Sequence, residues 1–226
     1  LLMLFCFITA CILVYLIVLH VTGRKLYALI GALMPLCFTF TSVWAWFNRV
    51  DIMAVMFDLA GIYIALKFWK SNWFYASIPL FLLAFLTKQS TLAGVAAVFI
   101  WVAFNHWRSS FVYGSIYCVG VLGIILVGYT LTSGQFFNEI FLYQRTIPAF
   151  RDNFGFLMVA GYLELIPLLL LSWQYVKVNT KSVLSIYAAM AVILSLVTII
   201  RPGGAANYFF EAIFALIITS ACALPM

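Results

Sequence analysis

The run LMLFCFITACILVYLIVLH, residues 2–20, is apolar almost throughout and contains no Asp, Glu, Lys or Arg. An α-helix needs about 20 such residues to cross the hydrocarbon core of a bilayer. A membrane-spanning strand would instead alternate apolar and polar residues. Across the chain 67% of residues are hydrophobic and 8% are charged, against roughly 25% charged in an ordinary soluble domain. We therefore predict an all-α, polytopic transmembrane helix bundle.

Similar apolar runs divide the chain into about eight or nine membrane helices, which we predict to form a single domain over residues 1–226. No internal repeat or low-complexity linker is evident. The chain begins with Leu1 inside an apolar run and ends at Met226 directly after another, so we expect it to be a fragment of a longer protein. The predicted spans are residues 2–20, 26–43, 51–69, 73–87, 91–106, 111–132, 155–176, 182–200 and 208–225.

The loops between these spans fall into two sets that alternate along the chain. One set is purely basic, and the positive-inside rule places it in the cytoplasm. The other set mixes both signs and faces outward. The net charge of +6 is therefore a topology signal and does not indicate nucleic-acid binding. The basic set is Arg24, Lys25, Lys67, Lys70, Arg108, Lys177 and Lys181, and the mixed set is Arg49, Asp51, Lys88, Glu139, Arg145, Arg151, Asp152, Arg201 and Glu211.

Three outward-facing segments gather polar residues at the edge of the apolar zone. Ionisable groups at this depth are costly, so each is a candidate functional residue, although charges at span ends also snorkel to the headgroups without further role. Cations at the headgroup level can hold a lipid phosphate. The candidates are Arg49 and Asp51 in the first segment, Lys88 and Gln89 in the second, and Arg201, Asn207, Tyr208 and Glu211 in the third.

Two further acids, Asp58 and Glu164, lie inside predicted spans. They are either neutral or paired packing groups, or part of a transport pathway. Together with the helix-breaking Gly203-Gly204 pair, they support a membrane transporter or lipid flippase as the alternative function. A non-enzymatic membrane scaffold is a third alternative.

Three motifs resemble the GT-C superfamily of polytopic glycosyltransferases, which use polyprenyl-phosphate sugars. They are NRVDIMAVMFDLAGIYIAL at residues 48–66, FLLAFLTKQSTLAGVAAVFIW at 81–101 and GGAANYFFEAIFALI at 203–217. The sequence is most similar to the bacterial dolichyl-phosphate-mannose-transferase-like, or Rgt-like, subgroup. Each motif alone is weak, and the resemblance depends on their order, spacing and sidedness.

The resemblance implies transfer of a sugar from a polyprenyl-phosphate donor to an external acceptor, which is a lipid, glycan or protein, at the outer face of the membrane. It assigns Lys88 to the donor phosphate, with Arg49 and Arg201 as further phosphate-binding candidates. Asp51 would orient Lys88 or the acceptor. The subgroup implies a bacterial plasma (inner) membrane and, as partners, the donor lipid and membrane lipids. The other cavity-lining candidates are Gln89, Asn207, Tyr208 and Glu211.

One feature of the family is missing from this sequence. The family's catalytic carboxylate lies in an acidic motif of the first external loop, and no such motif occurs here. We therefore expect the general base to lie upstream of Leu1, with Asp51 as the alternative. A divalent metal ion could also neutralise the phosphate, but no His, Asp and Glu residues show the spacing of a ligand set.

Overall fold

The computed structural model describes residues 1–38, 41–42, 50–139, 151–199 and 206–226, with the backbone alone described for 151–164, 199 and 206–207. Within these residues the chain is helical and contains no strand. The helices are α1 (Leu2–Thr22), α2 (Lys25–Cys37), α4 (Asp51–Lys67), α5 (Ser77–Thr87), α6 (Ala93–Asn105), α7 (Trp107–Leu131), α8 (Gln135–Phe137), α9 (Arg151–Val178), α10 (Val183–Ile199) and α11 (Phe210–Ala223), with 3₁₀ turns η1 (Asn72–Ala76) and η4 (Ala206–Phe209).

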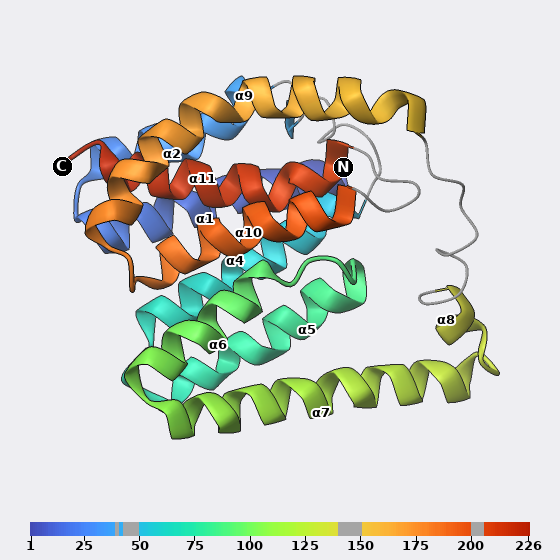
Figure 1. Ribbon diagram of the computed structural model, residues 1–226. Helices are drawn as coiled ribbons and strands as arrows, with labels where there is room; N and C mark the ends of the chain where they lie inside the picture. Colours follow the sequence, from blue (N-terminus) through green and yellow to red (C-terminus); the bar gives the residue numbers. More distant parts are fainter. Residues whose placement is uncertain (39–40, 43–49, 140–150, 200–205) are drawn as a thin grey trace.

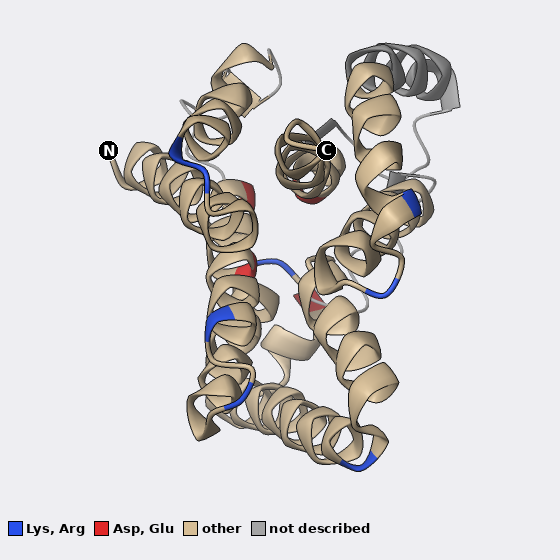
Figure 2. Ribbon diagram, turned by 90° about the vertical axis from the view of Figure 1, so that its left-hand side faces the viewer, with Lys and Arg blue, Asp and Glu red and all other residues tan. Residues whose placement is uncertain are grey.

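The long helices run back and forth between two ends of the molecule (Figure 1). The α1–α2, α6–α7 and α9–α10 turns lie at one end, and the α5–α6 turn lies at the other. Figure 2 looks at the first of these ends, where blue Lys and Arg positions mark the turns and the red Asp and Glu positions lie among the helices. The alternation predicted from the loop charges is therefore present in the fold.

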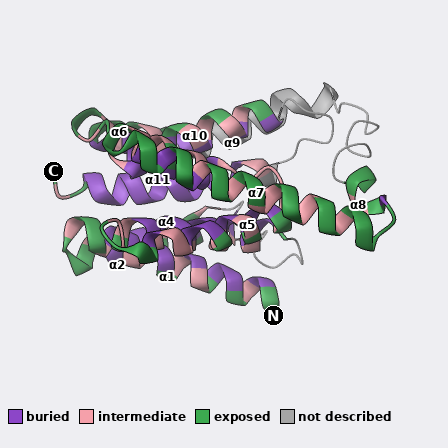
Figure 3. Ribbon diagram, turned by 90° about the horizontal axis from the view of Figure 1, so that it is seen from below, coloured by how far each residue is buried: buried purple, intermediate pink, exposed green. Residues whose placement is uncertain are grey.

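The centre of the bundle is α11. Every residue from Phe210 to Ala223 is buried, and the helix contacts α1, α2, α4, α9 and α10. Figure 3 shows it purple along its length, while much of α7 is green. Such an all-round apolar helix can be stable only inside a bundle.

The outer helices, in contrast, expose apolar side chains. In α7 only Ser110 and Tyr113 are buried, and large apolar side chains such as Leu122 and Leu126 are exposed. In water this surface would be unstable, whereas in a bilayer it contacts lipid. Two helices, α1 and α7, are both long and apolar enough to cross a membrane, and other apolar helices such as α6 and α11 have 10–17 residues.

Each predicted span meets a helix within the described residues, but several boundaries differ. The span predicted over 26–43 ends as a helix at Cys37. The span predicted from 111 begins at Trp107, because the single residue His106 ends α6 and starts α7. The α1 terminus at Thr22 follows from Gly23, whose φ of 67° suits glycine and lets its N–H bond to the Leu19 carbonyl.

Candidate functional site

The site is built around the first residue of α4. Asp51 begins this helix after Val50 and is 4% exposed. An acidic side chain in the first turn is stabilised by the positive end of the helix dipole. Its Oδ1 lies 2.6 Å from Nζ of Lys88. Two motifs that lie far apart in the sequence therefore form one ion pair.

Lys88 occupies the turn between α5 and α6. The residue is extended, with φ −153° and ψ 112°, and its N–H bonds to the Ala84 carbonyl, which ends α5. Its side chain is 16% exposed, and Nζ lies 4.4 Å from the centre of the Tyr208 ring. A cation over an aromatic face at this distance is attracted electrostatically. Lys88 is thus held between α4 and η4.

The ion pair faces a small cavity. Ser195 of α10 donates its hydroxyl to the Tyr208 carbonyl at 2.8 Å and so ties η4 to α10 beside it. About 10 Å³ is accessible to water here, space for about one water molecule or one oxygen atom of a larger group, so the described walls do not enclose a whole phosphate group or a sugar. The lining residues are Asp51, Val55, Lys88, Ser90, Thr91, Leu194, Ser195, Thr198, Tyr208, Phe210 and Glu211.

Glu211 reaches from α11 to the start of α6. Its Oε1 accepts a hydrogen bond from the Ala93 N–H at 2.8 Å. The residue before α6, Leu92, supplies no side-chain cap, and the first N–H groups of a helix have no partner within it. Glu211 therefore caps α6 from another helix, at the end of the turn that carries Lys88.

The turn lies at a recessed level of the bundle. Figure 1 shows α7 continuing past the α5–α6 turn toward the same end of the molecule. At 1.5 Å per residue, the 13 residues of α6 span about 20 Å, less than the roughly 30 Å of a hydrocarbon core. The short helices therefore allow a polar turn to lie below the level that the long helices reach.

The predicted site residues are brought together in part. Asp51, Lys88, Tyr208 and Glu211 line one cavity, whereas Gln89 is half-buried and does not line it. Arg49, Arg201 and the side chains of Asn207 and Glu164 lie outside the described residues.

Sequence reasoning missed two wall residues of α10, Ser195 and Thr198. Their spacing of three places both on one helix face, which is the only signal in the sequence that could have indicated them.

Two other features bear on the chemistry. In the described part of the chain, no three His, Cys, Asp or Glu side chains gather into a group that could hold a metal ion. A second cavity of about 460 Å³ lies between α1 and α2 and is lined by residues such as Leu4, Ile8 and Leu33. Its walls are overwhelmingly apolar, so its surroundings suit a lipid chain rather than a reacting group.

These features define a class of protein: a polytopic helical membrane protein with a recessed cavity at one end that holds a nearly buried acid–lysine pair. Residues 1–131, more than half of the chain, match the family model described as dolichyl-phosphate-mannose-protein mannosyltransferase. The chain belongs to this family, and it is an integral membrane glycosyltransferase of the GT-C type. Comparisons with curated proteins and with solved structures found no match.

The matched residues include both members of the ion pair and Asp58, whereas Tyr208 and Glu211 lie beyond them. The resemblance seen in the sequence is thereby confirmed at the level of the family. The sugar, the acceptor and the orientation in the membrane belong to the proposal that follows.

Proposed function

We propose that this protein transfers a sugar from a polyprenyl-phosphate donor to an acceptor hydroxyl at the outer face of a bacterial plasma membrane, with Lys88 holding the donor phosphate. The observation that carries the proposal is the recessed ion pair of Lys88 with Asp51, at 2.6 Å. A polyprenyl phosphate places its charged group at the headgroup level and its chain in the bilayer. A cation recessed at the end of a membrane bundle can therefore contact the phosphate while the polyprenyl chain stays in the bilayer.

The reaction is a single displacement at the anomeric carbon. The bond from this carbon to the phosphate oxygen breaks as the acceptor oxygen forms the new bond, and polyprenyl phosphate leaves with the electron pair. Negative charge therefore grows on the phosphate, where a fixed cation stabilises the transition state more than the ground state. An ammonium group carries three N–H donors, so Lys88 can hold the Asp51 carboxylate and a phosphate oxygen at once.

Asp51 and Tyr208 position this cation. Asp51 accepts from Nζ and Tyr208 presents its ring to it, so the ammonium is aimed before the donor arrives. Preorganisation of this kind avoids reorganising the site during reaction. Because Asp51 is committed to Lys88, we assign the proton of the acceptor hydroxyl to the carboxylate that the family resemblance implies. Arg49 and Arg201 remain further phosphate candidates, and Asn207 remains a candidate for the sugar side.

The decisive experiment is transfer from a polyprenyl-phosphate sugar by the full-length gene product and its Lys88→Ala variant. Loss of one preorganised donor to developing charge costs about 10²–10³-fold in kcat, so we expect a loss of that size. Lys88→Arg should recover part of it. Lys70→Ala is the matched control, because Lys70 is exposed in a turn at the opposite end of α4.

Wild-type turnover by Lys88→Ala would exclude the role of Lys88. A wild-type protein that uses no polyprenyl-phosphate sugar would exclude the function itself. The transporter alternative derives no support from Asp58, because this side chain is 0% exposed and transport requires groups that line a water-filled path.

A further inference from the structure

An acidic side chain, Asp58, lies deeper in the bundle than the Asp51–Lys88 pair and has no direct role in the proposed transfer. Asp58, two helical turns along α4, is 0% exposed. Neither of its carboxylate oxygens has a hydrogen-bond partner in the described part of the chain. The backbone of α6 closes over it, because a methyl group added at Gly94 would overlap the carboxylate. An acid in this position needs either a partner or a proton, because burying an unpartnered charge is strongly unfavourable.

The group that faces Asp58 is a second carboxyl, that of Glu211. Glu211 is 7% exposed, and its carboxyl interacts directly with that of Asp58. Two ionised carboxylates are acceptors only and cannot bond to each other, whereas a protonated carboxyl is a donor. One proton placed between them turns a repulsive contact into a hydrogen bond.

The surrounding groups decide how many charges the pair can carry. Glu211 Oε1 accepts the Ala93 N–H, and the N-terminus of α6 contributes about half a positive charge. Asp58 faces the same helix start, because its carboxylate lies against Gly94. Lys88 also acts on Glu211 electrostatically, although Asp51 is its ion-pair partner. These groups stabilise one negative charge on the pair but not two, so the pair holds one proton.

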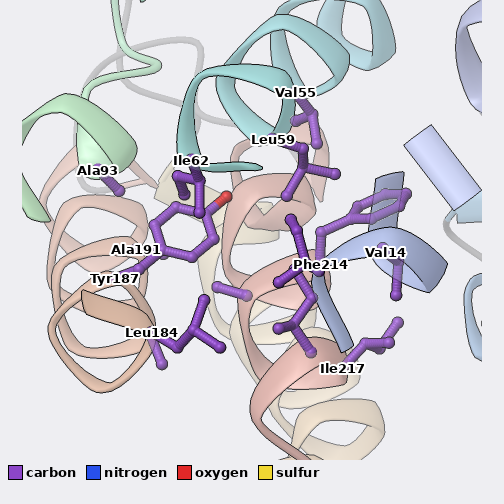
Figure 4. Close-up of a cluster of buried hydrophobic side chains, with 14 of the residues drawn as sticks. Val14, Val55, Leu59, Ile62, Ala93, Leu184, Tyr187, Ala191, Phe214 and Ile217 are labelled. Atoms are coloured by element: carbon purple, nitrogen blue, oxygen red, sulfur yellow. The ribbon is translucent and has the colours of Figure 1, made fainter. Parts of the chain in front are cut away.

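Two buried tyrosines complete the cluster. The hydroxyls of Tyr117 in α7 and Tyr187 in α10 lack a hydrogen-bond partner within the described residues, and both interact with Asp58 electrostatically. In Figure 4 the hydroxyl of Tyr187 points toward α4, beside Ile62. A tyrosine hydroxyl can donate to one carboxylate but carries no positive charge, so these two residues do not compensate a second ionised carboxylate.

We propose that Asp58 and Glu211 share one proton, and that this one-proton carboxyl pair is a positioning element that fixes the start of α6 and, through it, the turn that carries Lys88. The pair joins α4 to α11, and the Glu211–Ala93 hydrogen bond joins α11 to α6. Residues 88–92 connect that helix start to the end of α5. The effect on Lys88 rests on the proposed function, whereas the shared proton does not.

Infrared spectroscopy of the purified full-length protein near neutral pH tests the proton directly. We expect a carbonyl band of a protonated carboxyl that shifts in D₂O and disappears in Asp58→Asn, because the amide donates to Glu211 in place of the proton. The difference between the spectra of the wild type and the Asp58→Asn variant assigns the band to this pair. Asp51→Asn is the control and should keep the band. A wild-type protein without this carbonyl band, or an Asp58→Asn variant that retains the band, would contradict the shared proton.

The positioning role has its own measurement, the KM for a polyprenyl-phosphate sugar. Glu211→Ala removes the cap of α6, and we expect the donor KM to rise about tenfold, the equivalent of a typical cap. Glu211→Gln can still accept from Ala93 and donate to Asp58, so it should restore most of that loss. A Gln variant as impaired as the Ala variant overturns the positioning role. Failure of the wild type to use the donor overturns the proposed function and leaves the infrared result unaffected.

Discussion

The ion pair of Asp51 and Lys88 is nearly buried, with side chains 6% and 16% exposed. Such a pair adds little net stability, because the cost of removing both charges from water offsets their attraction. Removing one partner destabilises the protein, because the other charge is left unpaired where water has little access. The pair is therefore better explained by a task that needs a fixed cation than by stabilisation of the fold.

Gly94 is the residue whose size matters most at this scale. A Cβ at this position would overlap the Asp58 carboxyl, which is fully buried and cannot move to solvent. Overpacking of a tight core costs about 1–3 kcal/mol, so we predict that Gly94→Ala lowers the free energy of unfolding by about that amount. Denaturant unfolding of the protein in mixed micelles measures it.

Gly123 in α7 provides the matched control. A Cβ there meets nothing within 4 Å, and Ala is favoured over Gly inside a helix by about 0.5–1 kcal/mol. Gly123→Ala should therefore leave stability unchanged or raise it. Equal effects of the two substitutions would contradict the close packing of Asp58 against α6.

At the scale of single elements, α11 is positioned by polar contacts as well as by its apolar surface. Ser172 of α9 donates to the Leu216 carbonyl at 3.0 Å and accepts from the Thr219 hydroxyl at 2.8 Å. It also lies 3.1 Å from the Ser220 hydroxyl. Small polar residues allow membrane helices to approach closely and bond across their interface. This cluster therefore sets how α9 and α11 meet.

We predict that Ser172→Ala costs about 0.6 kcal/mol and at most about 1.7, as is usual for hydrogen bonds between membrane helices. The loss is small because Thr219 also bonds to the Ala215 carbonyl and Ser220 to the Leu168 carbonyl. The measurement is unfolding in mixed micelles. Thr130→Ala is the control, since Thr130 bonds only to carbonyls of its own helix α7 among the described contacts. A loss of several kcal/mol would mean that Ser172 holds more than these contacts.

For the whole molecule, the arrangement of turns makes orientation testable. The turns of the basic set lie at one end (Figure 2), so the positive-inside rule predicts that this end faces the cytoplasm. We predict that a membrane-impermeant thiol reagent added to intact cells labels Ser133→Cys, in the α7–α8 turn, but not Thr180→Cys, in the α9–α10 turn. Both positions are exposed.

The labelling requires a background without the five native cysteines. Both variants should react equally after the cells are opened, which controls for reactivity. The opposite pattern in intact cells would invert the orientation and place the Lys88 cavity in the cytoplasm.

The sequence was sufficient to predict the features that the bilayer alone imposes. Continuous apolar runs can satisfy their backbone polar groups in lipid only as helices, so the all-α bundle and its spans were predictable. The alternation of basic and mixed-charge loops also predicted that Asp51, Lys88 and Tyr208 lie on the same side. Boundaries such as the start of α7 at Trp107 were less predictable, because one residue at His106 joins two apolar helices.

The sequence by itself determined the helical class, the alternation of the turns and the family, because hydropathy, loop charge and local motifs are properties of short segments. Only the tertiary structure decided that Lys88 pairs with Asp51 and lies over Tyr208, and that Glu211 caps α6 beside Asp58. These contacts join residues that are far apart in the chain, and they depend on how helices of different length pack around α11. In the run at residues 2–20 the bilayer already dictates a helix, whereas the partners of a buried charge follow only from the packing of the whole bundle.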